Sequence, residues 1–303
     1  MWALSPMNVH NNVNGVGDCR REEVYALKHP DVTAIQDALA RKMTEELSGF
    51  DNVFFEICNE PYFGGVTLDW QRHIASVLAD AERPTGVRHL IAQNIANGSA
   101  KVTDPDPEVS ILNFHYAAPP NAVSQNFGLR RVVGFDETGF KGSGDHPYRT
   151  DGWDFLMAGG GLYNNLDYSY TVQSPQGRAV VAPPTPGGGG PALRSQLSVL
   201  QAFFARLDVV KMRPANDLLL TAVPAGATAR VLAETGRLYA VYITGSATVT
   251  LAFDLPAGTY TAEWVHPISG AADSPRTIEH RGGRLELTTP AYQEDIALRL
   301  TRK

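Results

Sequence analysis

Residues 52–61 read NVFFEICNEP, an apolar run that stops at Asn59, Glu60 and Pro61. A nearly continuous apolar run of this length is typical of a strand that is buried on both faces. Similar runs follow at residues 88–95, 109–115, 131–136 and 161–168, with helical stretches between them. Strands that alternate with helices predict βαβ units and therefore a parallel sheet.

The predicted helices support the same interpretation. Residues 31–48 place five apolar side chains at helical spacing, and Gly49 follows as a stop signal; they are Val32, Ile35, Leu39, Met43 and Leu47. A second helix is predicted at 192–207, after a loop rich in proline and glycine. No strand leads into a Gly-x-Gly-x-x-Gly turn, so a dinucleotide-binding sheet is disfavoured. Polar residues gather where the strands end, as they do in a (β/α) barrel.

The pattern changes after residue 207. Short alternating runs follow one another at close intervals with no convincing helix between them; they span 228–233, 237–243, 248–253, 260–266, 284–289 and 295–300. This pattern predicts a small antiparallel β-sandwich. We therefore expect two domains, a (β/α) barrel at 1–207 and a β-sandwich at 208–303. The sandwich is expected to stabilise the barrel by packing, with ligand binding as the alternative.

Composition excludes several classes of protein. The 303 residues are 43% hydrophobic and 19% charged, with a net charge of −6. A chain with no basic run is not expected to bind nucleic acid, and no apolar run approaches the ~20 residues of a membrane helix. Two cysteines cannot form a disulfide framework, and no metal-ligand spacing is present. The N-terminus lacks an export signal, so we expect a cytoplasmic protein if the chain is complete.

A second acidic residue ends another strand. Residues 131–139, RVVGFDETG, form an apolar run that stops at Glu137 and a glycine turn. Two glutamates at strand ends could supply the carboxyl pair of a glycoside hydrolase, in which one protonates the leaving oxygen and the other attacks the anomeric carbon. This chemistry needs no cofactor. The plainer alternative is that both are solvated loop glutamates.

At these residues the sequence resembles clan A of the glycoside hydrolases, which contains the family 5 cellulases and mannanases. In that clan an Asn-Glu pair ends strand four and supplies the acid/base, and a Glu that ends strand seven is the nucleophile. The resemblance implies that Glu60 is the acid/base and Glu137 the nucleophile. It also implies that Asn59 binds the 2-hydroxyl of the sugar.

The resemblance implies further substrate contacts. Residues 111–116, ILNFHY, are similar to the sixth strand of the clan, whose His and Tyr orient the nucleophile and bind sugar; these would be His115 and Tyr116. Tyr168 matches the aromatic platform after strand eight, and His10 and Asn12 lie in a polar loop that would line the cleft. The alternatives are a core histidine at 115, core packing for Tyr168, and a plain turn at 10–12. Glu56 shares strand parity with Glu60 and is expected to be paired and structural.

If Glu60 ends strand four, three βα units should precede it, which takes about 90 residues at the usual size of a barrel. Only residues 1–52 precede Val53, and the one candidate for the end of strand three is WALS at residues 2–5. We therefore predict an incomplete TIM barrel of about six strands that lacks the first two. Unpaired strand edges invite another chain, so a homo-oligomer, or else the N-terminal segment, is expected to cover the opening.

The sequence thus favours a retaining β-glycosidase that acts on a carbohydrate substrate. Two alternatives stay open: a degenerate barrel that binds sugar without cleaving it, and an inactive fragment of a longer hydrolase.

Overall fold

A computed structural model of the chain describes residues 2–245 and 248–303. Five strands form a curled parallel sheet, a half-barrel in the order β1-β2-β3-β4-β5. The strands are β1 (Phe55–Glu56), β2 (Ile91–Asn97), β3 (Ile111–His115), β4 (Val132–Glu137) and β5 (Leu162–Tyr163). This arrangement is consistent with the predicted incomplete TIM barrel, with five strands in place of about six.

The sixth strand expected at residues 2–5 is not a strand. Trp2–Leu4 forms a short 3₁₀ helix, η1, and the amide of Ser5 donates to the carbonyl of Trp2 at 3.0 Å. The Ser5 side chain then accepts from the amide of Met7 at 3.2 Å, so local turn bonds satisfy the backbone groups that a sheet would use. The apolar residues at this end were too few to favour a strand over these hydrogen-bonded turns.

Contacts between Cα atoms divide the chain into two compact units. The first comprises residues 1–115 and 128–134, and the second comprises 116–127 and 135–303. The division predicted at residue 207 stays a prediction. No helix in residues 2–245 and 248–303 is long and apolar enough to cross a membrane.

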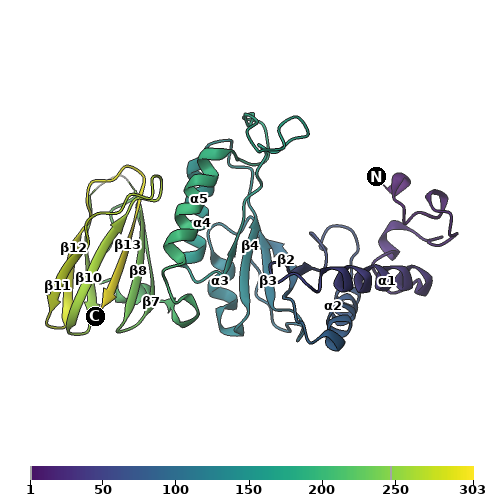
Figure 1. Cartoon of the computed structure of the whole chain (residues 1–303), viewed down its shortest axis with the longest axis horizontal. Coiled ribbons are helices and arrows are strands. Elements are labelled where there is room, and N and C mark those ends of the chain that lie inside the picture. Colours follow the sequence, from purple (N-terminus) through teal and green to yellow (C-terminus); the bar gives the residue numbers. More distant parts are fainter. Residues whose placement is uncertain (1, 246–247) are drawn as a thin grey trace. The chain divides into compact units, whose positions relative to one another are not determined.

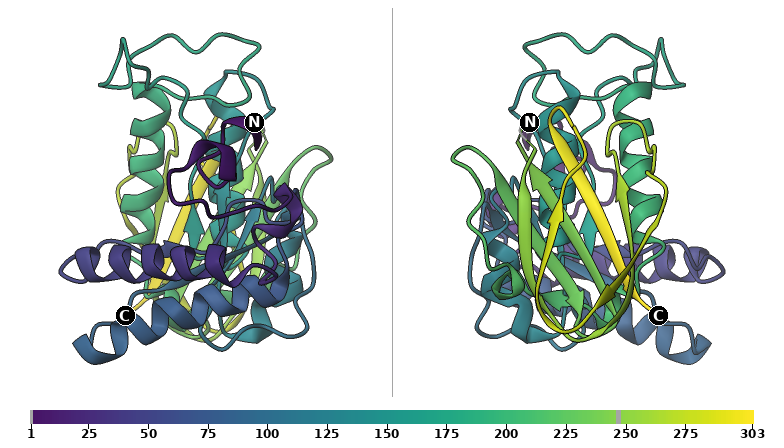
Figure 2. Two further views of the ribbon diagram at one scale, coloured as in Figure 1. Left: turned by 90° about the vertical axis from the view of Figure 1, so that its right-hand side faces the viewer. Right: turned by 90° about the vertical axis from the view of Figure 1, so that its left-hand side faces the viewer.

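Two α-helices of the first unit lie next to each other, as Figure 1 and Figure 2 show. They are α1 (Pro30–Leu47) and α2 (Leu68–Glu82). Pro30 suits the first turn of α1, where no backbone donor is lost. Thr67 caps α2, because its hydroxyl accepts from the amide of Trp70 at 3.2 Å. Helix α1 matches its predicted range to within one residue.

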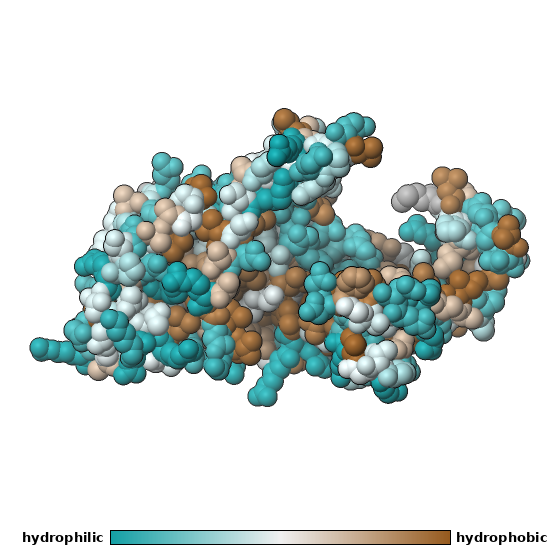
Figure 3. Space-filling model, in the orientation of Figure 1, coloured by the Kyte–Doolittle hydropathy of each residue, from teal (hydrophilic) through white to brown (hydrophobic). Residues whose placement is uncertain are grey.

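The face of α1 that packs inward is only partly formed by the apolar series. The buried side chains include Gln36, Ala40 and Thr44, whereas Leu39 and Met43 of the apolar series are 58% and 46% exposed. The buried polar groups have partners, which removes the penalty of desolvation. Gln36 donates to the carbonyl of Val24 at 3.1 Å and accepts from the indole of Trp70 at 2.9 Å. Helix α1 therefore presents an apolar face to solvent, and Figure 3 shows hydrophobic side chains among hydrophilic ones over this region.

His89 joins three segments of the first unit. Its side chain is buried at 4% exposure, and its Nε2 donates to the carbonyl of Phe50 at 2.6 Å. Its Nδ1 contacts a carboxylate oxygen of Glu82, at the end of α2. Because both ring nitrogens face oxygen acceptors, the carbonyl of Phe50 first and then Glu82 raise the pKa of His89.

We expect this clamp to make stability depend on pH. The raised pKa in the folded state means that the stabilisation is fully present below the unfolded pKa of about 6.5 and is lost as pH rises through the folded value. His89→Gln should flatten the fall in unfolding free energy, measured by urea denaturation between about pH 5.5 and 8.5. The exposed His10 supplies the control variant, His10→Gln, which should keep the wild-type slope. Equal slopes in wild type and His89→Gln would contradict this account.

The second unit contains three α-helices and the C-terminal strands. The helices are α3 (Asn121–Asn126), α4 (Asp145–Met157) and α5 (Pro191–Phe204), and α5 corresponds to the helix predicted at 192–207. Short 3₁₀ segments lie at Val9–Asn11, Arg21–Glu23, Arg83–Thr85, Phe127–Leu129, Val209–Lys211 and Asn216–Leu218.

Two antiparallel sheets follow α5. One has six strands in the order β11-β10-β13-β8-β7-β6, and the other pairs β12 with β9. The bounds are β6 (Arg213–Pro214), β7 (Thr228–Glu234), β8 (Leu238–Thr244), β9 (Thr250–Leu255), β10 (Gly258–Val265), β11 (Arg276–His280), β12 (Gly283–Thr288) and β13 (Asp295–Arg302). All six predicted strands are found, and β6 and β11 were missed. Side chains of both sheets share one buried apolar cluster, which supports the β-sandwich that stays a prediction.

The opposite face of the six-stranded sheet packs against α4 and α5, which stand beside it in Figure 1. Trp153 of α4 stacks on Tyr242 of β8 with ring centroids 5.2 Å apart. Both residues are at most 1% exposed and belong to a cluster that also contains Leu200 and Phe203. The C-terminal sheet and the two helices therefore share one apolar core.

Candidate active site

Glu60 lies just beyond β1 in a strained turn. The amide of Ile57 still donates to the carbonyl of Ala92 at 3.1 Å, after which the chain leaves the sheet. Glu60 has φ +44°, a left-handed conformation that residues other than glycine seldom adopt. The amide of Phe63 closes the turn onto the carbonyl of Glu60 at 3.0 Å. Backbone strain of this kind is concentrated at functional sites, and the Glu60 side chain stays 25% exposed.

His115 is the last residue of β3 and contacts Glu60 within the first unit. Its side chain is 1% exposed, and its Nδ1 lies 3.2 Å from Oε1 of Glu60. Either group can supply the hydrogen of this contact, because a protonated Glu60 can donate and Nδ1 carries a hydrogen in one tautomer of the imidazole. His115 is thus a buried histidine whose ring contacts Glu60, and its role toward the nucleophile and the sugar stays a prediction.

The first unit also contains a carboxylate–amide pair. The Asn113 side chain, fully buried in β3, donates to Oε2 of Glu56 at 2.6 Å. Glu56 was expected to be paired and structural, and the hydrogen bond confirms that it is paired. The neighbouring strand places Asn94 beside Asn113 in the β2–β3 register.

Glu137 is the last residue of β4 and is held by Tyr116 within the second unit. The Tyr116 hydroxyl donates to Oε1 of Glu137, and its backbone amide donates to the Glu137 carbonyl at 2.8 Å. Tyr116 also has a left-handed backbone, with φ +51°. One residue thus orients both the main chain and the carboxylate at the end of this strand.

The turn after Glu137 needs glycine and carries an exposed ring. A Cβ at Gly139 would lie 2.6 Å from the carbonyl oxygen of Pro186, closer than atoms can approach. Phe140 follows at 72% exposure, with its ring 5.5 Å from that of Tyr116. The sequence reasoning missed Phe140, although an aromatic residue directly after Glu-Thr-Gly at a strand end was a usable signal.

The other predicted residues lie in less specific surroundings. Asn59 is exposed beside Glu60, and Tyr168 is 37% exposed with its amide bonded to the carbonyl of Gly188 at 2.9 Å. His10 is exposed in the 3₁₀ segment Val9–Asn11. Asn12 donates to the carbonyls of Pro6, Asn8 and Val16, so it orders its own loop. Their roles toward a sugar stay predictions.

Comparisons with known proteins give a likeness of fold. No protein-family model matches the sequence, and no curated protein matches it. Among solved structures, one described as a glycoside hydrolase aligns at TM-score 0.64 and 12% identity, over 88% of this chain and 68% of that one. A family 5 glycoside hydrolase from Bacteroides vulgatus ATCC 8482 aligns at TM-score 0.65 and 12% identity, over 88% and 66%. Xyn30A, a family 30 subfamily 8 xylanase from Clostridium acetobutylicum, aligns at TM-score 0.54 and 12% identity, over 97% of this chain and 77% of that one.

These alignments confirm the resemblance to clan A barrels at the level of the fold. The chain spans about two-thirds of the length of the first two structures. A likeness at such low sequence identity supports the fold alone. The substrate and the mechanism have to be inferred from the residues themselves.

Proposed function

We propose that the chain is a retaining β-glycoside hydrolase in which Glu60 is the acid/base and Glu137 the nucleophile. One observation carries the proposal. Glu60 is hydrogen-bonded to His115 and Glu137 to Tyr116, and these two partners are consecutive in the chain. A retaining hydrolase needs its two carboxyls about 5–5.5 Å apart, and partners that are adjacent in the chain support the proposed pairing of Glu60 with Glu137.

The proposed reaction has two displacements. Glu60 donates its proton to the glycosidic oxygen while a carboxylate oxygen of Glu137 attacks the anomeric carbon, so the C–O bond to the leaving group breaks and a glycosyl ester forms. Glu60 then takes a proton from water, and the water oxygen attacks the anomeric carbon and releases Glu137. Two inversions retain the β configuration, and both carboxyl groups return to their starting protonation states.

The neighbouring side chains take supporting roles in this proposal. The Tyr116 hydroxyl occupies Oε1 of Glu137 and thereby orients Oε2 for attack. Asn59 would bind the 2-hydroxyl, where a hydrogen bond strengthens in the transition state. Tyr168 would offer an apolar face to the sugar ring, and the exposed ring of Phe140 beside Tyr116 supports a similar role for that residue.

A panel of aryl β-glycosides with a product-anomer assay tests the function. We expect hydrolysis of at least one glycoside with a β product formed first. Binding of a sugar without cleavage would instead favour a degenerate, non-catalytic barrel. Neither binding nor cleavage across the panel would favour an inactive fragment of a longer hydrolase.

We also propose that two copies of the chain associate through the first unit. Strand β1 is an edge of the half-barrel, and helix α1 presents Ile35, Leu39 and Met43 at 41%, 58% and 46% exposure. These residues are spaced by four, so an antiparallel copy of α1 centred on Leu39 would set each Ile35 against the Met43 of the other copy. The face is thus self-complementary, as a two-fold interface requires.

Leu39→Glu should convert the dimer to a monomer, because it would place two like charges at the centre of the contact. Light scattering after size exclusion at micromolar concentration measures the change. Val210→Glu, at a side chain that is 93% exposed in the second unit, is the matched control and should stay dimeric. A monodisperse monomer of the unaltered protein would refute the association.

A further inference from the structure

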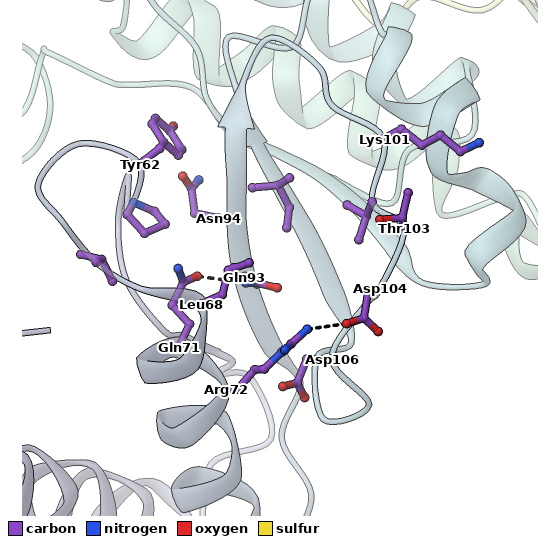
Figure 4. Close-up of a pocket in the computed structure, with 14 residues that line it drawn as sticks. Tyr62, Leu68, Gln71, Arg72, Gln93, Asn94, Lys101, Thr103, Asp104 and Asp106 are labelled. Carbon is purple, nitrogen blue, oxygen red and sulfur yellow. Dashed lines mark hydrogen bonds and ion pairs between the residues drawn. The ribbon is translucent and has the colours of Figure 1, made fainter. Parts of the chain in front are cut away.

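A cavity of about 440 Å³ lies within the first unit, apart from the residues that hold Glu60 and Glu137. The start of α2, strand β2 and residues 101–106 form its walls, as Figure 4 shows. Its size falls within the range of about 300–1,000 Å³ that is usual for small-molecule sites. Pro61 and Tyr62, which follow Glu60 directly, close one side of it.

Asn94 is the unusual residue of this cavity. It is 2% exposed, and neither the oxygen nor the nitrogen of its side chain has a hydrogen-bond partner within the described residues. Figure 4 shows its amide end pointing toward the ring of Tyr62. Buried amide groups in proteins are nearly always paired, so an amide of this kind in a cavity wall indicates a group that binds a ligand.

The strand geometry explains why Asn94 lies there. The register between β2 and β3 shifts between Asn94 and Ala96, and Gln93, Asn94 and Ile95 all line the cavity. Irregularities of this kind redirect side chains near functional sites. Gln93 is already satisfied, because its amide donates to Gln71 at 3.0 Å. Asn94 therefore differs from its neighbour in having its donors and acceptor available.

The charges around the cavity favour a neutral ligand. Arg72 and Lys101 carry two positive charges, and Asp104 and Asp106 carry two negative ones. Arg72 and Asp104 already neutralise each other at 2.6 Å near the surface. A charged ligand, whether an anion or a cation, would gain little electrostatic attraction from a cavity lined by equal numbers of positive and negative side chains.

The remaining lining groups fit a sugar. An amide such as Asn94 can both donate to and accept from hydroxyl groups, which is what a polyhydroxylated ligand requires. Tyr62, Pro61 and Leu68 supply apolar surface for the C–H face of a ring. We propose that this cavity binds one neutral sugar unit, with Asn94 as its central hydrogen-bonding group.

Two sources could supply that sugar: the leaving-group unit of the substrate, which rests on the function proposed above, or a separate saccharide. Binding is measured first, on the full chain carrying Glu137→Gln so that no cleavage occurs. The probes are β-1,4-linked disaccharides of glucose, mannose and xylose, followed by calorimetry and by the side-chain amide resonances in nitrogen-15 spectra. At least one disaccharide should bind and shift the Asn94 amide resonance, and Asn94→Leu should weaken it about tenfold or more.

Asn94→Leu should keep or raise the melting temperature, because it removes polar atoms that have no partner in the folded chain. Asn126→Leu is the matched control: Asn126 is fully buried and donates to the carbonyl of Ala122 at 2.9 Å, so its loss should lower stability without changing sugar affinity. If no disaccharide moves the Asn94 resonance, or if Asn94→Leu binds as tightly as its parent, the sugar site is refuted.

A kinetic comparison then identifies the source. With Glu137 intact, Asn94→Leu should slow disaccharide hydrolysis and leave aryl glycosides unaffected if the cavity takes the leaving-group sugar. If Asn94→Leu hydrolyses both substrates as fast as its parent although disaccharide binding is lost, the cavity binds a separate saccharide. Failure of the hydrolase proposal alone would abolish these rates in every variant while the binding result stands.

Discussion

Replacing Glu137 by glutamine will lower kcat/KM for aryl β-glycosides by on the order of 10⁴–10⁶-fold, the size of effect seen when a covalent nucleophile is removed. The amide cannot form the glycosyl ester, so the two-step reaction loses its first step. Glutamine keeps an oxygen that can accept from the Tyr116 hydroxyl, so the local structure should survive. Steady-state rates and a melting curve on the same preparation measure both effects.

The anomeric configuration of the product distinguishes the roles of Glu60 and Glu137 more clearly than reaction rates do. In Glu137→Ala, azide can attack the anomeric carbon from the vacated side and give an α-glycosyl azide by a single inversion. In Glu60→Ala, azide should instead intercept the glycosyl ester and give the β product. Glu56→Gln, in β1 four residues before Glu60, is the control and should retain most activity, because a glutamine oxygen can still accept from Asn113. Full activity in Glu137→Gln, or the α product from Glu60→Ala, would overturn the assignment.

The second large effect concerns stability. Arg149 of α4 is 2% exposed and bridges to the fully buried Asp295 of β13, with Nε 2.9 Å from Oδ2. It also donates to Gln196 of α5 at 2.7 Å. Arg149→Met would leave Asp295 charged and buried without its partner, which should cost about 3–5 kcal/mol of unfolding free energy. Urea denaturation at neutral pH measures the loss.

Two further variants define the cause. Arg149→Met combined with Asp295→Leu should recover part of the stability, since the unpaired charge is then gone. Lys211→Met removes an exposed ion pair with Asp208 and should leave the denaturation midpoint unchanged. An Arg149→Met variant as stable as the parent would show that the buried pair does not stabilise the fold.

Much of the fold could be predicted because the strands of the parallel sheet coincide with uninterrupted apolar runs in the sequence. The runs at 109–115 and 131–136 correspond to β3 and β4 to within two residues. Glu60 follows the end of the first run, and Glu137 follows the run at 131–136. Local hydrophobicity determines such strands, whatever packs on them later.

The face of α1 could not be predicted in this way. Periodicity identified the helix but not its neighbour, and Gln36 and Thr44 became buried because Val24, Trp70 and the helix backbone offered partners. The 2–5 segment failed for a different reason, since short-range turn bonds outcompeted four residues of weak strand character. Tertiary partners decide the buried face of α1, and the sequence pattern does not contain them.

The candidate site was partly readable. Both glutamates and the His115-Tyr116 pair follow from motifs at strand ends. Phe140 and the Asn94 cavity were missed, because they depend on a turn conformation and on a register shift in β2. Such features arise from how strands and loops fit together, which a single sequence does not display.

The left-handed backbone at Glu60 and Tyr116 has a consequence for how this chain would evolve. At each position glycine would relieve about 1–3 kcal/mol of conformational strain, while it would delete the acid or the hydroxyl that orients Glu137. A lineage selected only to stay folded would drift toward glycine at both positions. In this chain both positions keep a side chain, and the proposed reaction uses both of them.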